Sequence, residues 1–485
     1  MDLHRLAGML MVVLVLVIEL DMPILSRANL VFNVQHKFAG RERSLSAFKA
    51  HDAQRHRRIL YAAQLPLGGN GHPAEASLYF TKIGLGNPSN DYHVQVDTGS
   101  DILWVNCVGC DKCPDKSDLG IKLRLYDPKS SSSSSSVNCG DEFCTSTYNG
   151  VIPGCNKTIP CQYNVVYGDG SSTAGYFVKD TLHFDRPTGD LQTSSTNGTI
   201  IFGCGAVQSG GLGSSNDAVD GILGLGQSNS SMISQLASAG KVKRVFSHCL
   251  DSVNGGGIFA IGELVSPKLN TTPMLPNKAH YNVVLKDIEV GGSILEIPTS
   301  IFDLGKQKEA IIDSGTTLAY LPEVVYETMM NKITEHQPGL KLHTVEERFT
   351  CFRYDGKVDD GFPVVKFHFA ESLTLSVYPR EYLFKIRDEL WCFGWQNSAM
   401  QSKDGRDMTL LGDLVLSNKI FMYDIEKQAI GWTEYDCSSS IKVKDETTGS
   451  VYSVKGGEIS PASHLMSGKG LPILLLLLAM FQRLI

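Results

Sequence analysis

The sequence predicts an all-β protein made of two related lobes around a central cleft. The chain has 47 glycines, and short β-like runs recur between glycine turns. A four-residue pattern of aspartate, a hydroxyl residue, glycine and a second hydroxyl residue occurs as Asp97-Thr98-Gly99-Ser100 and, 216 positions later, as Asp313-Ser314-Gly315-Thr316. We call these two segments the acidic turns. Each turn follows a short apolar or alternating strand and precedes more apolar residues. Each half of the chain therefore contains one acidic turn between apolar segments. We expect each lobe to bring one carboxylate to a shared cleft.

Length and composition fit a globular protein with a substantial core. The 485 residues are enough for two or three domains. Hydrophobic residues are 42% and charged residues 20%, which is not the composition of a disordered chain. The net charge of -7 argues against a nucleic-acid partner.

The N-terminal region has the features of a secreted precursor. Residues 7–18 form a 12-residue apolar run after His4 and Arg5, too short to span a bilayer comfortably. We therefore expect a signal peptide over residues 1–26, with cleavage near Ser26 to Ala28. Residues 27–75 hold eight Lys/Arg and three Asp/Glu ahead of an acidic body. This excess of positive charge favours a pro-segment over residues 27–75 that is held to the acidic body by charge and can be detached. A disordered basic arm is the alternative.

The body, residues 76–437, is expected to divide into lobes at 76–254 and 255–437, near a run of three glycines. Alternating apolar residues over 365–369 and 373–377 predict a hairpin with one apolar face, and 281–290 predicts a strand. One helix is expected to be capped by Ser231 and to end at Gly240. Another should begin near Pro322 and cover 324–333. The serine run 130–136 is expected to be a surface loop within one domain, with an interdomain linker as the alternative.

The C-terminal region, residues 438–485, resembles a signal for a glycosylphosphatidylinositol (GPI) anchor. Small and polar residues at 456–463 precede an apolar run at 471–481, which is the order of such signals. The candidate attachment residues are Ser460, Ala462 and Ser463. A short transmembrane tail and a loose hydrophobic end are the alternatives.

Cysteine usage also predicts secretion. The chain has 12 cysteines, all between Cys107 and Cys437, and an even number in a secreted body implies disulfides. Four sequons for N-glycosylation fit the same compartment. Their asparagines are Asn156, Asn197, Asn229 and Asn270. We expect a secretory-pathway protein at the extracellular face of the plasma membrane or in the cell wall.

The two aspartates, Asp97 and Asp313, indicate acid–base chemistry on a water molecule. Two carboxyl groups held close together cannot both ionise easily, so the pair can share one proton. One group then acts as base on water while the other donates a proton, which is what hydrolysis of a peptide bond requires. Thr98 and Ser314 could hydrogen-bond to the opposite loop. The second hydroxyl residue of each turn could hydrogen-bond to its carboxylate.

On these motifs the chain resembles the pepsin-like aspartic proteases over roughly residues 76–437. Residues 101–105 resemble the family's aromatic-bearing strand. Residues 165–171 resemble the flap hairpin that closes over substrate, with Tyr167 at the flap tyrosine position. Residues 220–226 and 410–413 resemble the paired apolar segments behind the two catalytic loops, and 422–432 resembles the closing hairpin.

This resemblance implies a bilobal fold and an aspartic endopeptidase, with Asp97 and Asp313 catalytic and with activity at mildly acidic pH. It also implies a group of flap and substrate-binding residues, in which the Tyr167 hydroxyl bonds the indole N–H of Trp104. That group is Tyr167, Gly168, Trp104, Gly99, Ser100, Gly315, Thr316 and Thr317. We expect a monomer with peptide or protein substrates, a membrane link through a lipid anchor, and no metal or other cofactor. The alternatives are a catalytically silent binding or inhibitor protein with this fold and a structural wall protein, for which the sequence has no repeats.

The cysteine spacing resembles the plant nepenthesin-like branch of these proteases, and the C-terminal region suggests an anchored member. The spacing Cys107-x-x-Cys110-x-x-Cys113 follows the first loop, and four more cysteines surround the serine run. A redox or zinc motif is the alternative, but no histidine cluster accompanies it. The resemblance implies the pairs Cys107–Cys110, Cys113–Cys204, Cys139–Cys161, Cys144–Cys155, Cys249–Cys437 and Cys351–Cys392.

Overall fold

The computed structural model describes residues 30–36, 78–117, 119, 121–150, 152–156, 158–167, 171–214, 218–253, 255–297, 308–345, 349–387, 389–399, 408–445 and 449–455. The predicted signal peptide, most of the predicted pro-segment, Gly168 and the anchor candidates Ser460, Ala462 and Ser463 lie outside these residues. Within the described ranges, none of the helices combines the length and the apolar character needed to cross a membrane.

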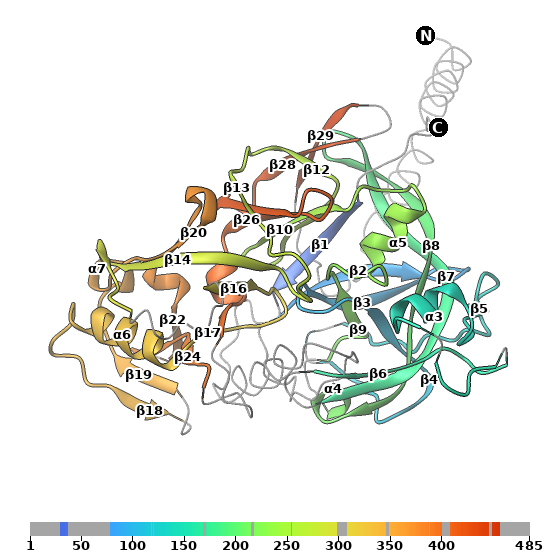
Figure 1. The fold of residues 1–485 in the computed structure, drawn as a ribbon, viewed down its shortest axis with the longest axis horizontal. Coiled ribbons are helices and arrows are strands. Elements are labelled where there is room, and N and C mark those ends of the chain that lie inside the picture. The colour runs from blue at the N-terminus through green and yellow to red at the C-terminus, as the bar shows by residue number, and fades with distance from the viewer. Residues whose placement is uncertain are drawn as a thin grey trace, which may run out of the picture.

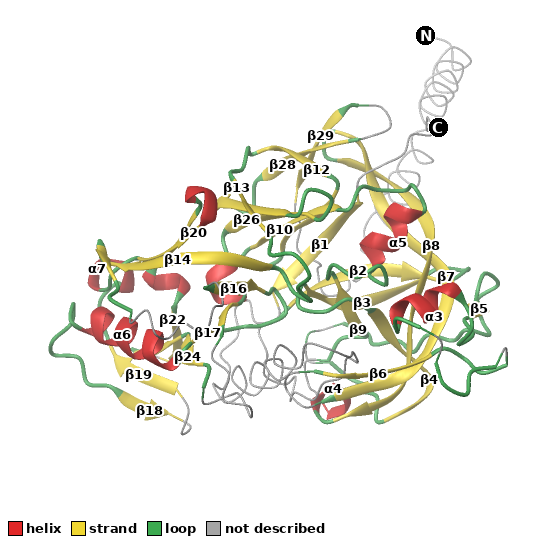
Figure 2. Ribbon diagram, in the orientation of Figure 1, coloured by secondary structure: helices red, strands yellow, loops and turns green. Residues whose placement is uncertain are grey.

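The described residues are mostly β-strand and form two lobes, which confirms the predicted fold class. In Figure 1 the blue and green strands gather in one lobe and the gold and orange strands in the other. Figure 2 shows short helices outside the sheets. The helices are α3 (Glu142–Thr147), α4 (Gly211–Ser214), α5 (Met232–Ser238), α6 (Glu323–Thr334), α7 (Val358–Gly361), α8 (Asp413–Leu416), and the 3-10 turns η3 (Ala370–Ser372) and η4 (Pro379–Glu381).

The largest sheet of the described residues has 14 strands and contains segments from both halves of the chain. Its strands are β1 (Leu30–His36), β2 (Tyr79–Leu85), β3 (Asn90–Asp97), β4 (Leu103–Asp111), β5 (Ser135–Ser136), β6 (Gln162–Val166), β7 (Ser172–Gly189), β8 (Gln192–Ser209), β9 (Gly221–Gly224), β10 (Val245–Leu250), β11 (Gly257–Ile261), β13 (Thr271–Pro273), β26 (Lys419–Asp424) and β27 (Ala429–Glu434).

The second lobe is built on smaller sheets. An eight-stranded sheet carries the second acidic turn; its strands are β14 (Asn282–Val290), β15 (Ser293–Ile294), β16 (Glu309–Ile312), β17 (Ala319–Leu321), β20 (Val365–Phe369), β21 (Thr374–Val377), β24 (Trp395–Asn397) and β25 (Thr409–Leu411). A four-stranded sheet packs beside it, made of β18 (His343–Val345), β19 (Phe349–Arg353), β22 (Leu383–Arg387) and β23 (Leu390–Phe393).

The two halves share the sheet that joins them. Strand β26 pairs antiparallel with β10, which also pairs with β11. The expected lobe border at 254/255 falls in the turn between β10 and β11. The C-terminal segment therefore returns to complete a sheet begun before that border.

Segments on both sides of the expected body also join its sheets. Strand β1, from the predicted pro-segment, pairs with β11 and β2. Strands β28 (Ser440–Lys444) and β29 (Val451–Lys455), from the predicted tail, form a sheet with β12 (Glu263–Ser266). In β28 the buried Ile441 and Val443 alternate with exposed residues, so this strand covers a small core with its apolar face.

The two expected helices are present where their capping residues place them. The hydroxyl of Ser231 accepts a hydrogen bond from the backbone N–H of Ser234 and caps α5, and Gly240 follows the helix with a positive φ of 65°. Pro322 is the N-cap of α6.

The alternating patterns also form strands as expected. Residues 365–369 and 374–377 are the antiparallel hairpin β20–β21, and Gly291 and Gly292 close β14. The serine run is a loop for most of its length. Its last two residues are β5, an edge strand that pairs with β7.

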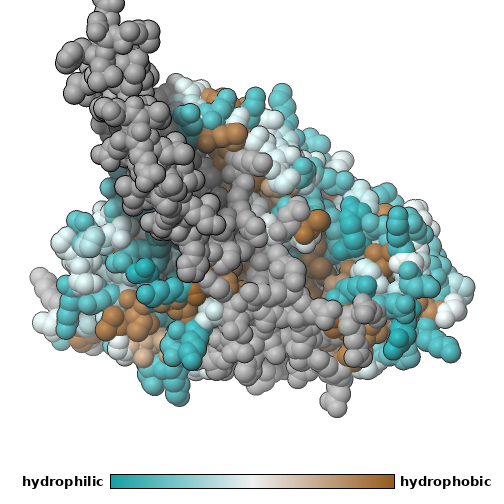
Figure 3. All heavy atoms as spheres, turned by 180° about the vertical axis from the view of Figure 1, so that it is seen from behind, coloured by the Kyte–Doolittle hydropathy of each residue, from teal (hydrophilic) through white to brown (hydrophobic). Residues whose placement is uncertain are grey.

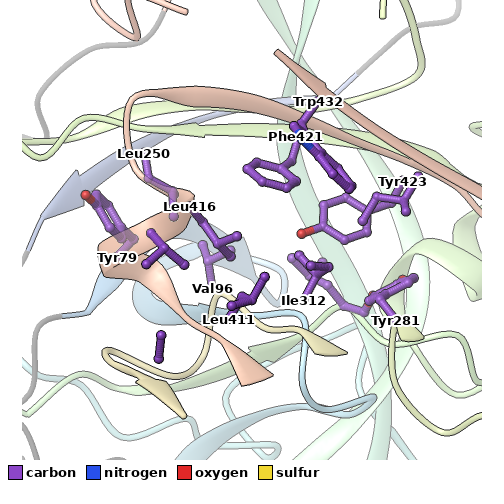
Figure 4. Packing of buried hydrophobic residues seen from close by; sticks show 14 of the residues in the cluster. Tyr79, Val96, Leu250, Tyr281, Ile312, Leu411, Leu416, Phe421, Tyr423 and Trp432 are labelled. Carbon is purple, nitrogen blue, oxygen red and sulfur yellow. The ribbon is translucent and has the colours of Figure 1, made fainter. Parts of the chain in front are cut away.

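The hydrophobic core continues from one lobe into the other. Figure 4 shows part of it, in which Val96 and Ile312, the residues before the two aspartates, lie in the same buried cluster. Tyr423 of β26 belongs to this cluster and stacks on Phe246 of β10, with ring centroids 4.5 Å apart. The strands that end at the two acidic turns are therefore held by one common core.

The surface combines hydrophilic residues with small apolar areas. Figure 3 shows this on the face opposite that of Figure 1, as teal areas interrupted by brown ones. Large apolar residues such as Val108 and Val253 are exposed. Exposed apolar side chains of this kind are common on protein surfaces and need no special role.

Four of the six predicted disulfides are wrong. Cys107 pairs with Cys204, and Cys110 with Cys113. Cys107 and Cys204 are buried on the adjacent parallel strands β4 and β8, whereas Cys110 and Cys113 are only half-buried at the end of β4 and just beyond it. Neighbouring strands, and not closeness in sequence, therefore select the partner of Cys107.

The second correction concerns the cysteines around α3. The pairs are Cys139–Cys155 and Cys144–Cys161, which cross instead of nesting as predicted. Helix α3 buries Cys144 completely beside the equally buried Cys161, while Cys155 stays half-buried in the loop near Cys139.

The two remaining pairs, Cys249–Cys437 and Cys351–Cys392, are confirmed. Cys351 and Cys392 lie directly opposite each other on β19 and β23.

Peptide mapping without reduction will test the corrected pairing. Digestion followed by mass spectrometry should find a peptide of β4 linked to a peptide of β8 through Cys107 and Cys204. The same digest after reduction is the control, since every linked mass must then disappear. A linked mass that joins Cys113 to Cys204 would contradict the structure.

Candidate active site

The two acidic turns meet at the centre of the molecule. Asp97 is the last residue of β3 and Asp313 directly follows β16. Both side chains are buried, with exposed fractions of 0% and 3%. The structure brings the Asp313 carboxyl group against the first turn, because a Cβ atom on Gly99 would lie 2.6 Å from its Oδ1. Glycine is therefore required at position 99 for this close approach.

Each carboxylate receives the same two hydrogen bonds from its own turn. The backbone N–H of Gly99 donates to Asp97 Oδ1 at 2.9 Å, and that of Gly315 donates to Asp313 Oδ1 at 2.8 Å. The Ser100 hydroxyl donates to Asp97 Oδ2. The Thr316 hydroxyl donates to Asp313 Oδ2 at 2.7 Å. Such bonds orient a carboxylate and favour its ionised form.

Thr98 and Ser314 join the two turns across the interface. The backbone N–H of Ser314 donates to Thr98 Oγ1 at 2.8 Å, and the backbone N–H of Thr98 donates to Ser314 Oγ at 3.3 Å. These two bonds are reciprocal and buried. They fix the position of one aspartate relative to the other.

A short strand passes behind each turn, as the resemblance implies. Strand β9 pairs parallel with β3, and β25 pairs parallel with β16. Gly224 is the last residue of β9 and Gly412 directly follows β25. A Cβ atom on Gly224 would lie 2.5 Å from backbone atoms of Asp101 and Ile102, just after the first turn, and one on Gly412 would lie 2.4 Å from the carbonyl oxygen of Thr316, which ends the second turn. The backbone at the end of each turn therefore lies against a glycine.

The flap residues are partly described. The indole N–H of Trp104 donates to the Tyr167 hydroxyl at 2.8 Å, as expected, and both side chains are buried. Gly168 lies outside the described residues. Thr317 is buried, and its carbonyl accepts a hydrogen bond from the backbone N–H of Leu414 at 3.0 Å.

The four sequon asparagines are all exposed, so each is accessible for modification. They are Asn156, Asn197, Asn229 and Asn270.

Sequence reasoning did not single out three residues near the turns. The Gln95 side-chain amide donates to the carbonyl of Gly315 at 3.5 Å, which is a further link between the halves. Tyr423 and His248 lie behind the first turn, with the Tyr423 hydroxyl 2.9 Å from His248 Nε2. A glutamine or histidine within an apolar strand has no sequence signal that identifies a partner so distant along the chain.

On the expectation that the chain hydrolyses peptides, replacing Gly99 by alanine should lower kcat/KM for a peptide substrate by about 10- to 10²-fold. The added methyl group would push the Asp313 carboxyl group, which the Gly315 N–H and the Thr316 hydroxyl hold in place. Gly140→Ala is the matched control, because its methyl group would contact only Cys155 Sγ at 3.9 Å. Equal kinetics for the two variants would contradict this account of the close approach.

The arrangement can activate water. Two buried carboxyl groups on facing turns form a coupled pair that can hold one proton between them. The ionised member can take a proton from a water molecule, and the protonated member can donate one to a leaving group.

Comparison with family models matches both halves of the chain. Residues 79–263 match the xylanase inhibitor N-terminal model, and residues 280–434 match the xylanase inhibitor C-terminal model.

Several curated plant proteins are similar to this chain. Aspartic proteinase 36 of Arabidopsis thaliana is 52% identical over 99% of this chain and 98% of its own length. Aspartic proteinase 39 of the same plant is 49% identical over 96% of both chains. Aspartic proteinase nepenthesin-2 of Nepenthes gracilis is 29% identical over 75% of this chain and 78% of its own.

Solved structures share the fold at low sequence identity. The crystal structure described as edgp has a TM-score of 0.62 at 18% identity, covering 85% of this chain and 96% of that one. Conglutin gamma, a basic 7S globulin from lupine seeds, has a TM-score of 0.61 at 18% identity, with the same coverage.

Proposed function

The chain, both halves of which match the xylanase inhibitor models, belongs to a family of plant aspartic proteinases, and we propose that it is an aspartic endopeptidase. One observation carries the proposal. The Asp313 carboxyl group lies against the turn that holds Asp97, and both carboxylates have the same set of donors. A binding protein has no need of two matched carboxylates in this position.

In the proposed reaction, the coupled pair Asp97 and Asp313 activates a water molecule between the turns. The ionised carboxylate takes a proton from water as the water oxygen attacks the carbonyl carbon of the peptide bond. The protonated carboxyl group then provides the proton that the leaving nitrogen requires. Because one group must be protonated and the other ionised, the rate should follow a bell-shaped curve with its maximum at mildly acidic pH.

The flap supplies a cover for the substrate in this proposal. Tyr167 directly follows β6, which pairs antiparallel with β7, and its hydroxyl accepts the hydrogen bond from the Trp104 indole. Closure of such a hairpin over an extended peptide would exclude water other than the nucleophile. The substrates would be peptides or proteins.

The proposed location is the extracellular face of the plasma membrane or the cell wall. The N-terminal apolar run, the 12 cysteines and the C-terminal apolar run motivate this proposal. Treatment of cells with a phosphatidylinositol-specific phospholipase should release the protein into the medium. Retention on the membrane after complete treatment would argue against a GPI anchor.

A catalytically silent binding or inhibitor protein is the second candidate. The family models carry the name of xylanase inhibitors, and a seed globulin shares the fold. The matched donors around both aspartates favour the protease instead.

Cleavage assays will separate the two candidates. The full-length precursor should be secreted from a eukaryotic host, acidified, and assayed on a denatured protein and a peptide library across acidic and neutral pH. We expect cleavage with an acidic maximum that a statine-type transition-state mimic abolishes. Absence of cleavage at every pH by folded protein would favour the binding protein.

A further inference from the structure

A groove with a volume of about 820 Å³ lies beside the hairpin of β6 and β7. Ligand sites in proteins commonly have about 300–1,000 Å³. Strands β6, β7 and β8 line the groove together with residues 148–150, 152 and 153, which follow α3. Figure 1 shows these elements together in one lobe. None of the described residues that line the groove belongs to an acidic turn, so this is a separate site. We call it the tyrosine groove.

The tyrosine groove is uncharged. Among the described residues that line it there is no aspartate, glutamate, lysine, arginine or histidine. Its polar side chains are tyrosines and the three amides of Asn149, Gln162 and Asn164. These amides are exposed, and within the described ranges none of the three side chains has a hydrogen-bond partner. They are therefore available to hydrogen-bond to a ligand.

Three tyrosine rings line the groove from different elements. Tyr148 follows α3, Tyr163 belongs to β6 and Tyr176 to β7. The Tyr148 hydroxyl donates to the carbonyl of Gln162 at 2.7 Å, which holds this ring against β6. Tyr163 is buried, and Tyr176 packs against the main core. The rings are therefore fixed before a ligand arrives, which lowers the entropic cost of binding.

Exposed apolar side chains continue the groove across the sheet. Val207 of β8 is 45% exposed, and its register partner on β7 is Ala174. Ala174 in turn pairs with Asn164 of β6, so the three side chains form one row on the same face. Val166, two positions after Asn164, shares this face and is 47% exposed. Apolar groups gathered beside polar ones in this way mark interaction sites.

A proline-rich peptide segment matches this chemistry. In a polyproline II helix the backbone carbonyls are free to accept hydrogen bonds, and proline has no N–H group to donate. The groove offers amide donors to such carbonyls and tyrosine rings to the pyrrolidine rings. Aromatic-lined grooves are the usual binding sites of polyproline II segments, which are ordered in advance and lose little entropy on binding.

Two other classes of ligand match the groove less well. A charged ligand would lose its hydration without gaining an opposite charge, because the described lining residues carry none. A neutral oligosaccharide presents hydroxyl donors on every ring, and the described part of the groove has no carboxylate to accept them. The balance of donors and acceptors therefore favours the proline-rich segment.

We propose that the tyrosine groove binds a proline-rich segment of the protein substrate in the polyproline II conformation, away from the bond that is cleaved. The proposal rests on the proposed protease function for the role of that segment as part of a substrate, whereas binding itself requires no catalysis. Strand β6 leads directly into Tyr167 of the flap. A segment held in the groove therefore lies beside the hairpin that would cover the scissile bond.

The binding test titrates the full-length protein with a decaproline peptide that is capped at both ends. Asn164→Asp and Val207→Asp should each weaken binding at least about 10-fold, because each places a carboxylate against a ligand that has only acceptors. Asn331→Asp and Val253→Asp are the matched controls, since they make the same changes at exposed positions outside the groove. Both controls should bind like the unchanged protein, and Tm should show that all four variants are folded.

Three results of this titration would overturn the proposal. The first is that decaproline binds the unchanged protein no better than a capped glycine-serine peptide of the same length. The second is equal affinity in the groove variants and the control variants. The third is binding of a neutral oligosaccharide, with cellohexaose as the probe, that is lost in Asn164→Asp, because the groove would then serve a glycan.

A kinetic comparison tests the role of the groove in substrate selection. A cleaved peptide joined to ten prolines through glycine-serine linkers of several lengths should have a KM about 10-fold lower than the peptide alone, at the best linker length. The kcat should stay within about twofold, because the reacting groups are unchanged. In Asn164→Asp the two substrates should have the same KM. An equal KM for both substrates in the unchanged protein at every linker length would overturn the role in substrate selection.

The two assays separate failure of this proposal from failure of the proposed function. If the unchanged protein cleaves nothing, the proposed function fails, and the decaproline titration alone then judges the groove. If it cleaves peptides but does not bind decaproline, the proposed function stands and the groove proposal fails.

Discussion

Replacing Asp97 by asparagine should lower kcat/KM for a peptide substrate by about 10²- to 10⁴-fold, the range expected when general acid–base catalysis is lost. Asparagine has nearly the shape of aspartate and can keep the hydrogen bond from the Gly99 N–H. It cannot ionise, so it cannot share a proton with Asp313. The measurement is initial rate against substrate concentration at acidic pH, with Tm recorded to show that the variant is folded.

Asp313→Asn and the double variant complete this experiment. If the two carboxyl groups act as one unit, each single variant should lose nearly as much activity as the double variant. Ser438→Ala, at an exposed hydroxyl outside the site, is the control. Full activity in a folded Asp97→Asn variant would rule out the proposed mechanism.

Replacing Lys419 by methionine should destabilise the folded protein by about 3–5 kcal/mol, the cost of breaking a buried ion pair. Lys419 Nζ is 2.6 Å from Glu381 Oε2, and the two side chains are 1% and 3% exposed. Burial lowers the pKa of Lys419, and the attraction to Glu381 opposes this shift. Without the lysine, the hydrogen bond that remains to the Glu381 carboxylate within the described part of the chain is the one from the backbone N–H of Tyr378, at 3.1 Å.

Chemical denaturation monitored by tryptophan fluorescence will measure this loss. Lys332→Met is the matched control, since its partner Glu335 is 62% exposed and surface pairs contribute about 0–1 kcal/mol. The double variant Lys419→Met with Glu381→Leu should recover most of the lost stability, because no charge is then left buried. A loss for Lys419→Met as small as that for Lys332→Met would contradict the buried pair.

The features that sequence predicted well are local. Asp97 and Asp313 are found from four-residue motifs, and the helix at Ser231 is found from a cap and an apolar face one turn away. The hairpin at 365–377 follows from alternation alone. In each case the residues that determine the structure are neighbours along the chain, so a single sequence contains the signal.

The features that sequence missed depend on pairing between distant segments. Cys107 bonds to a cysteine 97 positions away because β4 and β8 are neighbours, and no spacing rule reveals that neighbour. Strand β28 was assigned to a tail because its partner β12 lies far back in the chain. The partner of His248, the Tyr423 hydroxyl, is 175 positions further on, so no local pattern in the sequence indicates it.

The shared sheet has a consequence for limited proteolysis. The turn between β10 and β11 is accessible, with Val253 76% exposed, and it lies at the expected border of the lobes. A nick there would not release two independent pieces. Strand β10 would stay paired with β26, and Cys249 would stay bonded to Cys437 on the other fragment. The nicked protein should run as one species on a non-reducing gel and separate into two fragments only when a thiol is added.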